Sequence, residues 1–183
     1  MDAAAQAAMY SVVTTAAHLS LLFSYFFLAA VAIPDAVVAY SAATVVAALV
    51  IDSTVCVAHA GDSRAYILSG KKLRQITKDH SIVQEMVDRG SLTPDEAKED
   101  PRKNIITRAL GVEDDLRIDF CEEDIGESDV LMICTDGLTN YVEPQEIYEL
   151  TDDGKFFEYA ERLVNRANEN GGGDNITVVT VSY

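Results

Sequence analysis

Short apolar or alternating runs separated by turn residues dominate the chain from about residue 44 onward. Four of them follow one another, at residues 45–51, 55–58, 64–68 and 73–76. Runs of this length, bounded by turn signals, are typical of strands. The last two flank Ser69-Gly70-Lys71, as the strands of a hairpin do. Short turns between consecutive strands indicate an antiparallel meander.

Helical patterning follows the four predicted strands. An apolar stripe recurs at helical spacing at Ile82, Val83, Met86 and Val87. Gly90 suits the position after the last turn of that helix. A second helix is expected to begin at Thr93-Pro94-Asp95-Glu96, because Thr can cap it, Pro fits the first helical position and Glu completes a capping box.

The rest of the chain returns to strands around one amphipathic stretch. We expect strands at 116–120, 130–134 and 176–181, and a helix whose apolar stripe runs over 156–167. The acidic run 122–124 reads as a solvated turn. Strands, then helices, then strands again suggest a layered α+β domain.

The N-terminal segment, residues 1–43, differs sharply from this body. The first 63 residues contain neither Lys nor Arg, and residues 3–33 carry no charge apart from any on His18. An apolar run above about 18 residues is a candidate membrane span, which makes residues 9–33 a candidate membrane helix. The alternative is a buried helix or a segment that is not native to the fold.

Charge and cysteine usage narrow the class of protein. The chain has 183 residues, enough for one domain, and a net charge of −16 that argues against nucleic-acid binding. Cys56, Cys121 and Cys134 show no metal-ligand spacing, so we interpret them as reduced thiols of a cytoplasmic protein. The alternative location is a membrane anchor with the domain in the cytoplasm.

Three aspartates beside glycine are the candidate chemical groups. Asp62, Asp136 and Asp174 each lie in a Gly-Asp or Asp-Gly pair next to an apolar strand. Each pair alone is an ordinary turn. If the three carboxylates converge, their repulsion requires a cation, and oxygen ligands favour Mg²⁺ or Mn²⁺. His80 and His59 are interpreted as structural.

Five longer motifs carry a family resemblance. They are Ala60–Tyr66, Thr77–Ser81, Asn104–Gly111, Cys134–Asn140 and Gly172–Val178. In this order they resemble the metal-dependent protein serine/threonine phosphatases of type 2C (the PPM family), bacterial branch. The resemblance covers residues 44–183 and only the C-terminal part of that domain.

The resemblance implies an α+β fold, a four-layer β-sandwich of two antiparallel sheets flanked by helices, here incomplete at the N-terminal side. It implies that Asp136 and Asp174 bind the first metal of a pair and that Asp62 joins Asp136 around a third, weaker metal. The ions would be Mn²⁺ or Mg²⁺, two or three in the intact family and one or two here. Residues 82–102 would form a flap beside the site.

The implied reaction is hydrolysis of phosphoserine and phosphothreonine in proteins by metal-activated water, on substrates of a serine/threonine kinase. Two family segments, Arg-x-x-Asn-Glu-Asp and Asp-Gly-x-Gly-Gly, are missing from the chain. They supply a phosphate-binding arginine and the aspartate that bridges two metals, so we expect weak or no activity of this chain alone and identify no catalytic residue. The alternatives are a membrane-tethered, non-catalytic phosphatase-like binding module and a truncated or frame-shifted gene product.

Overall fold

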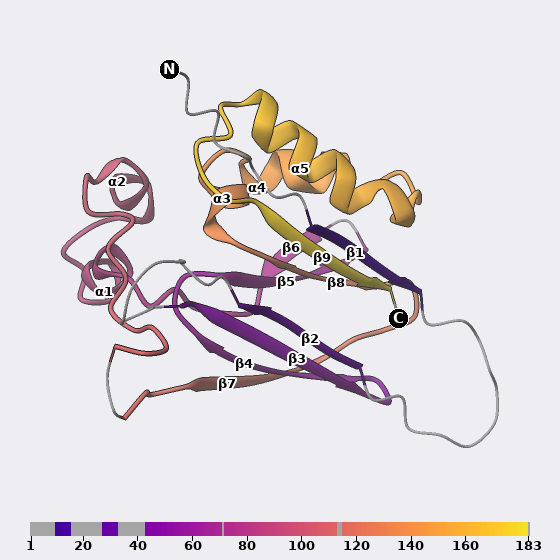
Figure 1. Cartoon of the computed structure of the whole chain (residues 1–183), viewed down its shortest axis with the longest axis horizontal. Helices are drawn as coiled ribbons and strands as arrows, with labels where there is room; N and C mark the ends of the chain where they lie inside the picture. Colours follow the sequence, from indigo (N-terminus) through magenta and orange to yellow (C-terminus); the bar gives the residue numbers. More distant parts are fainter. Residues whose placement is uncertain (1–9, 16–26, 33–42, 71, 113–114, 183) are drawn as a thin grey trace.

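Two β-sheets lie face to face in the computed structural model, which describes residues 10–15, 27–32, 43–70, 72–112 and 115–182 (Figure 1). One sheet has the strand order β1-β9-β8-β5-β6 and the other β2-β3-β4-β7. The strands are β1 (Tyr10–Thr15), β2 (Phe27–Ala32), β3 (Val45–Ile51), β4 (Thr54–Ala60), β5 (Arg64–Ser69), β6 (Lys72–Gln75), β7 (Asp119–Asp124), β8 (Val130–Cys134) and β9 (Thr177–Ser182).

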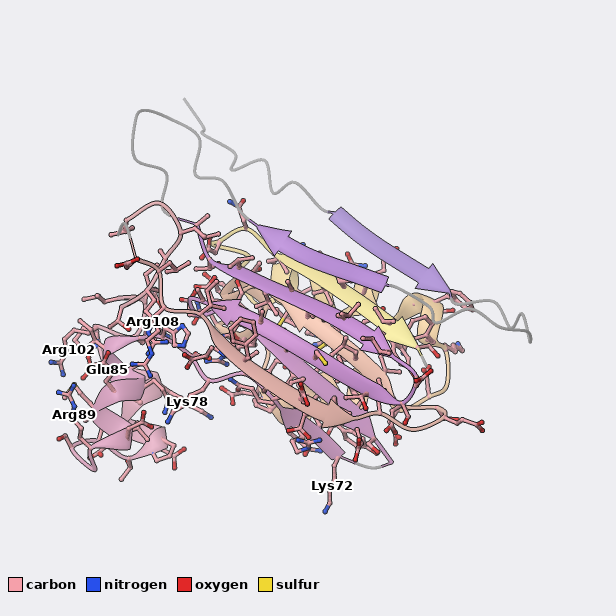
Figure 2. The ribbon with its side chains drawn as sticks, turned by 90° about the horizontal axis from the view of Figure 1, so that it is seen from below. Lys72, Lys78, Glu85, Arg89, Arg102 and Arg108 are labelled. Carbon is pink, nitrogen blue, oxygen red and sulfur yellow. The ribbon has the colours of Figure 1, made fainter. Side chains whose placement is uncertain are left out.

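Helices cover one outer face of this sandwich. α3 (Asp136–Thr139), α4 (Pro144–Leu150) and α5 (Tyr159–Glu169, preceded by a 3-10 turn at Phe156–Glu158) lie over the five-stranded sheet, while α1 (Ile82–Asp88) and α2 (Pro94–Glu99) form a lobe at one end (Figure 1). No helix of the described residues covers the outer face of the four-stranded sheet (Figure 2). The predicted α+β class with two sheets and flanking helices is confirmed.

The position of β8 between two hydrophobic cores explains why its sequence is apolar throughout. Leu131 and Ile133 point into the core between the two sheets, whereas Met132 and Cys134 point into a second core beneath the helices. A strand buried on both faces needs apolar residues at every position. The strand therefore belongs to both cores, and so do its neighbours β5 and β9, which contribute residues to the same two clusters.

The four-strand meander predicted for residues 45–76 is wrong in one respect. β3 and β4 form a hairpin in the four-stranded sheet, and β5 and β6 form a hairpin in the five-stranded sheet. The chain crosses between sheets at Gly61, whose φ of +116° is a conformation that glycine adopts readily and other residues rarely do. A glycine before the third strand thus marks a change of sheet rather than another hairpin.

The apolar N-terminal segment contains strands wherever the structure describes it. β2 pairs antiparallel with β3, and β1 pairs parallel with β9, the one parallel pair among the described strands. The other residues of the candidate membrane helix at 9–33, namely 9, 16–26 and 33, lie outside the described residues. Within the described part of the chain, no helix has the length and apolar character needed to cross a membrane. The boundary near residue 44 stays a prediction.

Two predicted elements in the body are corrected. The strand expected at 116–120 is β7 at Asp119–Asp124, so the acidic run 122–124 is strand and not turn. Glu123 forms an ion pair with Arg74, with 2.9 Å between their charged atoms. This partner on β6 explains how an acidic stretch joins a sheet edge, where charged side chains are common. The short helices α3 and α4 were not predicted, because neither is long enough to show a clear period.

The helix start at Thr93 is confirmed. The Thr93 hydroxyl accepts a hydrogen bond from the Glu96 backbone N–H, and the Glu96 side chain accepts one from the Thr93 backbone N–H at 2.8 Å. This reciprocal pair is the capping box that the sequence predicts. It fixes the start of α2 in a helix with no buried residue of its own.

We predict that Leu163→Ala on α5 lowers the free energy of unfolding by about 2–5 kcal/mol, the usual cost of truncating a buried leucine. Leu163 is fully buried beneath the helices. Urea unfolding followed by circular dichroism measures the change. Phe157→Ala, at a position 62% exposed, is the control and should change stability by less than about 0.5 kcal/mol. Equal losses in both variants would contradict this placement of the core.

Candidate functional site

The register of three adjacent strands brings the candidate aspartates to the same end of these strands in the five-stranded sheet. We call this end, with Asp62, Asp136 and Asp174, the aspartate edge. Arg64 at the start of β5 pairs with Cys134 at the end of β8, and Cys134 pairs with Val178 near the start of β9. Asp62 precedes β5, Asp136 follows β8 and Asp174 precedes β9. All three therefore lie at the same edge, with Asp136 in the middle because β8 is the central strand of the three.

Asp136 is held where β8 turns into α3. The Thr135 hydroxyl donates to the Asn175 carbonyl at 3.0 Å and accepts from the Thr177 backbone N–H at 3.1 Å. A side chain on residue 137 would overlap the Asn175 carbonyl, so only glycine lets these two segments of the chain approach this closely. The Asn140 amide donates to Asp136 Oδ2 at 3.1 Å. These contacts join the end of β8 to the loop that carries Asp174.

A glycine-rich loop packed against Tyr141 carries Asp174. A Cβ on Gly173 would overlap the Tyr141 hydroxyl, and one on Gly171 would lie 3.1 Å from the tyrosine ring. Asn170 also donates to the Tyr141 carbonyl at 2.8 Å. The Asp174 side chain is exposed, and its Oδ1 accepts from the Asn175 backbone N–H at 2.7 Å. Contact with Tyr141 thus fixes the path of the loop while the carboxylate stays accessible.

The turn that carries Asp62 is fixed by His80. The Gly61 backbone N–H donates to His80 Nδ1 at 3.1 Å, and the His80 backbone N–H donates to the Gly61 carbonyl at 2.9 Å. On its other side Gly61 packs so closely on Thr44 that a Cβ at 61 would overlap the threonine side chain. A residue other than glycine would therefore displace the turn.

Electrostatics show that the aspartates interact. Burial raises the pKa of Asp62 to about 6, and the charge of Asp136 contributes to the rise. Burial also raises the pKa of Asp136, with the charge of Asp174 as the next cause. The charge of Asp136 thus disfavours the ionisation of Asp62, and the charge of Asp174 disfavours that of Asp136. A cation bound between them would relieve this repulsion.

The cation nearest to the edge is already paired. Arg64 donates from Nε and Nη2 to the Asp79 carboxylate, at 2.9 and 2.6 Å, and lies 3.4 Å from the Tyr66 hydroxyl. Its charge lowers the pKa of both Asp62 and Asp136, but less than burial and their neighbours raise it. Neither Arg64 nor Asp79 was a predicted site residue, although both lie within the quoted motifs.

A second cluster, His59, His80 and Asp119, is the one group of three possible ligands among the described residues whose ligand atoms all lie within 4.8 Å of one another. The hydrogen bonds argue against a metal there. His80 Nδ1 accepts from Gly61, so the ring proton is on Nε2, which donates to Asp119 Oδ2 at 3.1 Å. Arg108 Nη1 also lies 3.0 Å from Nε2. A protonated nitrogen beside a guanidinium does not ligate a cation.

The ligand atoms of the three aspartates do not all lie within 4.8 Å of one another. Their order along the edge instead suits pairwise sharing, with Asp136 common to Asp62 and Asp174. Carboxylate oxygens are the ligands that Mg²⁺ and Mn²⁺ prefer. Three carboxylates along one edge are therefore a donor set of the kind that a hard divalent cation prefers.

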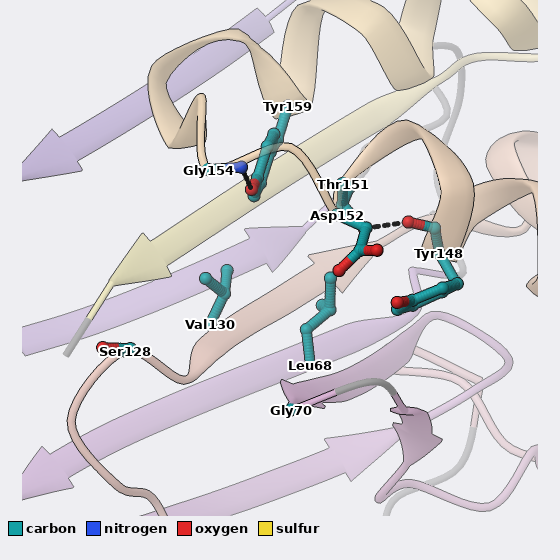
Figure 3. A pocket seen from close by; sticks show the side chains of 9 residues that line it. All are labelled: Leu68, Gly70, Ser128, Val130, Tyr148, Thr151, Asp152, Gly154 and Tyr159. Atoms are coloured by element: carbon teal, nitrogen blue, oxygen red, sulfur yellow. Dashed lines mark hydrogen bonds between the residues drawn. The ribbon is translucent and has the colours of Figure 1, made fainter.

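A shallow pocket lies at the other end of the strands (Figure 3). Leu68 and Val130 line it from β5 and β8, and Tyr148, Asp152 and Tyr159 line it from the helical side. The volume accessible to water is about 150 Å³. Because Leu68 and Val130 pair at the end of β5 opposite to Arg64, this pocket is separate from the aspartate edge.

Comparisons with known proteins agree with the fold. The family described as Protein phosphatase 2C matches residues 24–86, a range that begins upstream of residue 44. The serine/threonine phosphatase stp of Listeria monocytogenes is 43% identical over 139 residues, which are 75% of this chain and 55% of that protein. The chain thus spans about half the length of the curated relatives it matches.

Solved structures of serine/threonine phosphatases also superpose on this chain. The serine/threonine phosphatase Stp1 from Staphylococcus aureus superposes with a TM-score of 0.75 at 35% identity, over 78% of this chain and 57% of that one. The catalytic domain of the phosphatase PstP in complex with two manganese ions superposes with a TM-score of 0.67 at 35% identity, over 76% of this chain and 57% of that one.

The fold is thus that of the metal-dependent protein phosphatases. In sequence and in structure, the chain carries the C-terminal part of a PP2C-type serine/threonine phosphatase domain of the bacterial branch.

We predict that Asp62→Asn stabilises the metal-free protein by about 1–2 kcal/mol at pH 7. The folded pKa of Asp62 is about 6, above its ordinary value of 3.8, so between these pH values the folded state holds more protons than the unfolded one. Stability should therefore fall as pH rises through this window, and the variant should remove that fall. Urea unfolding at several pH values measures it.

The control for this prediction is Asp124→Asn. Asp124 is exposed and pairs with Thr54, at the opposite end of β4 from Gly61. Its pH profile should match that of the unsubstituted protein. A profile for Asp62→Asn parallel to both would show that the pKa of Asp62 is not raised in the folded protein.

Proposed function

We propose that the aspartate edge is part of a metal-dependent protein serine/threonine phosphatase site. The observation that carries the proposal is the convergence of Asp62, Asp136 and Asp174 at one edge of three adjacent strands. The named activity of the relatives supports the reaction type, because they are called serine/threonine phosphatases. The proposed reaction is hydrolysis of phosphoserine and phosphothreonine in proteins.

Each carboxylate has a proposed role. Asp136 and Asp174 hold one divalent cation, and Asp62 joins Asp136 around a second, weaker one. The manganese in the PstP structure supports Mn²⁺ as the ion, and Mg²⁺ prefers the same oxygen ligands. Such cations supply an activated water and neutralise charge on the phosphoryl group during transfer.

The residues of this chain contribute position and charge. The glycine contacts at 137 and 173 join the Asp136 turn to the Asp174 loop, and the contact of Gly61 with Thr44 holds the Asp62 turn. The pKa values of Asp62 and Asp136 are raised because the two negative charges are unfavourable there, and a bound cation would neutralise them. Arg64 stays bound to Asp79, so it balances the local charge without competing for the carboxylates. Binding of a cation should release protons wherever Asp62 is still protonated.

The proposed substrates are phosphorylated proteins, including those of a serine/threonine kinase. Asp174 is exposed, and the pocket described above lies at the far end of the strands, so the edge suits a phosphorylated side chain presented on a protein surface. The proposed location is the cytoplasm, since all three cysteines are free thiols. Attachment to a membrane through residues 9–33 is the alternative.

We further propose that this chain alone turns over substrate slowly or not at all. Its sequence has no Arg before Arg64 and no Gly before Gly61, so the phosphate-binding arginine and the bridging aspartate of the family have no counterpart in it. Two ions about 3.5–4 Å apart repel each other unless a shared carboxylate offsets the charge. In this proposal Asp136 is the one carboxylate shared by both ions, and one shared carboxylate offsets less of their repulsion than two would.

We predict that the chain binds Mn²⁺ and that Asp136→Asn weakens binding more than Asp62→Asn does. Asp136 contributes to both proposed ions, whereas Asp62 contributes to the weaker one. Loss of a carboxylate ligand should raise the dissociation constant by tenfold or more, which is about 1.4 kcal/mol. Titration followed by electron paramagnetic resonance of free Mn²⁺ measures this.

The matched control is again Asp124→Asn, which removes one negative charge from the surface far from the edge. It separates ligand loss from a change in net charge, and its Mn²⁺ affinity should equal that of the unsubstituted chain. Equal affinity in Asp136→Asn would rule out the aspartate edge as the metal site.

We predict that a phosphothreonine peptide is hydrolysed in Mn²⁺ at less than about one hundredth of the rate of an intact relative such as the Listeria phosphatase, since removing a single stabilising group commonly costs 10²–10³ in rate. Release of inorganic phosphate is the measurement. Turnover at the rate of the intact relative would refute the proposed deficiency. Mn²⁺ binding with no turnover would favour the non-catalytic binding module.

A further inference from the structure

We propose that Arg108, Asp119 and His80 form a hydrogen-bonded relay that sets the conformation of the Gly61–Asp62 turn and so positions Asp62. The proposal rests on the phosphatase function above, because it assigns positioning residues to the same edge. It concerns contacts that lie behind the aspartates rather than among them.

The relay is a continuous chain of contacts. Arg108 Nη1 donates to Asp119 Oδ1 at 2.8 Å, His80 Nε2 donates to Asp119 Oδ2 at 3.1 Å, and the Gly61 N–H donates to His80 Nδ1 at 3.1 Å. Because Nδ1 accepts from the Gly61 N–H, the ring proton is on Nε2, and this fixes one tautomer of the histidine. The adjacent residue is Asp62. The relay therefore ends on the backbone of a proposed metal ligand.

The histidine ring has little freedom to move. His80 is 5% exposed and stacks on His59, with ring centroids 4.7 Å apart and planes 11° from parallel. Its carbonyl accepts from the Thr107 N–H at 2.7 Å, which ties it to the strand-like segment before Arg108. Burial lowers the pKa of His59, so the stack pairs His80 with a neutral ring.

Three distant parts of the chain meet in this relay. The Gly61 turn links β4 and β5, Arg108 ends the segment that follows the α1–α2 lobe, and Asp119 begins β7. Figure 2 shows Arg108 where this lobe joins the sheets. No local turn signal requires the contact, since 39 residues separate His80 from Asp119 and 19 separate Gly61 from His80.

The relay has a consequence for the aspartate. Gly61 has a φ of +116° and little space on its Thr44 side, so the direction of its N–H is fixed. The N–H therefore needs an acceptor that lies in that direction. Without that acceptor the N–H is left unsatisfied and the turn shifts to find water. A ligand group works only when it is held within about 0.5 Å of its productive position. A small shift of the turn is enough to displace Asp62.

Two substitutions of the same histidine test the relay. In His80→Asn the amide oxygen can accept from the Gly61 N–H but cannot reach Asp119. In His80→Gln the amide can reach Asp119 but leaves the Gly61 N–H without its acceptor. We expect His80→Gln to accelerate exchange of the Gly61 amide hydrogen, measured by NMR, at least about tenfold. His80→Asn keeps the acceptor but loses its support from Asp119, so it should restore only part of the protection.

Metal affinity is the second readout. His80→Gln should raise the Mn²⁺ dissociation constant of the weaker ion about tenfold, and His80→Asn should raise it less. The matched control is Ile147→Val, which truncates a fully buried side chain beneath the helices, away from the relay. It lowers overall stability without touching the turn, so it should accelerate Gly61 exchange much less than His80→Gln does and leave the Mn²⁺ affinity unchanged.

The outcomes separate this proposal from the one on which it rests. Gly61 exchange equal in His80→Gln and Ile147→Val, or equally fast in both histidine variants, overturns the relay. Faster exchange in His80→Gln with unchanged Mn²⁺ affinity overturns the positioning of Asp62. If the unsubstituted chain binds no Mn²⁺, the metal-dependent function falls, and the exchange comparison decides by itself whether the relay sets the turn.

Discussion

Repulsion between carboxylates at one sheet edge is the constraint on which the rest of the structure depends. The pairing of β5, β8 and β9 leaves Asp62, Asp136 and Asp174 at the same edge, and the pKa of both Asp62 and Asp136 is raised there. Bringing like charges together is unfavourable unless other interactions fix the chain. The burial of β8 on both faces supplies that fixation, because its register cannot slip without exposing a core.

The loops at the edge are held by backbone contacts rather than by the carboxylates themselves. Glycines at 61, 137 and 173 allow approaches that a Cβ would block, against Thr44, Asn175 and Tyr141. Such approaches fix a turn without using the side chain that follows it. The aspartates are thus left available for a ligand, and the structural work is done by their neighbours.

Among the residues that the structure describes, no helix covers the outer face of the four-stranded sheet (Figure 2). Val45, Ala47 and Leu49 of β3 and Ala58 of β4 lie half-buried on that face, and Phe120 of β7 is 77% exposed beside Ala58. Apolar surface of this kind is unfavourable in water.

The sequence by itself determined much of the local structure. Apolar runs located β3, β4, β5, β6, β8 and β9 to within a few residues, and the capping box located the start of α2. Five longer motifs between Ala60 and Val178 identified the family, and three of these motifs contain Asp62, Asp136 and Asp174. These signals are short-range: strand periods, caps and turn glycines depend on residues that are close in the chain.

Only the tertiary structure decided how these parts meet. It showed that Gly61 carries the chain between sheets, that residues 122–124 belong to β7, and that Asp136 is the central carboxylate because β8 is the central strand. It also joined His80 to Asp119 across 39 residues. Strand order and buried hydrogen bonds between distant segments are set by packing of the whole core, and no local pattern encodes them.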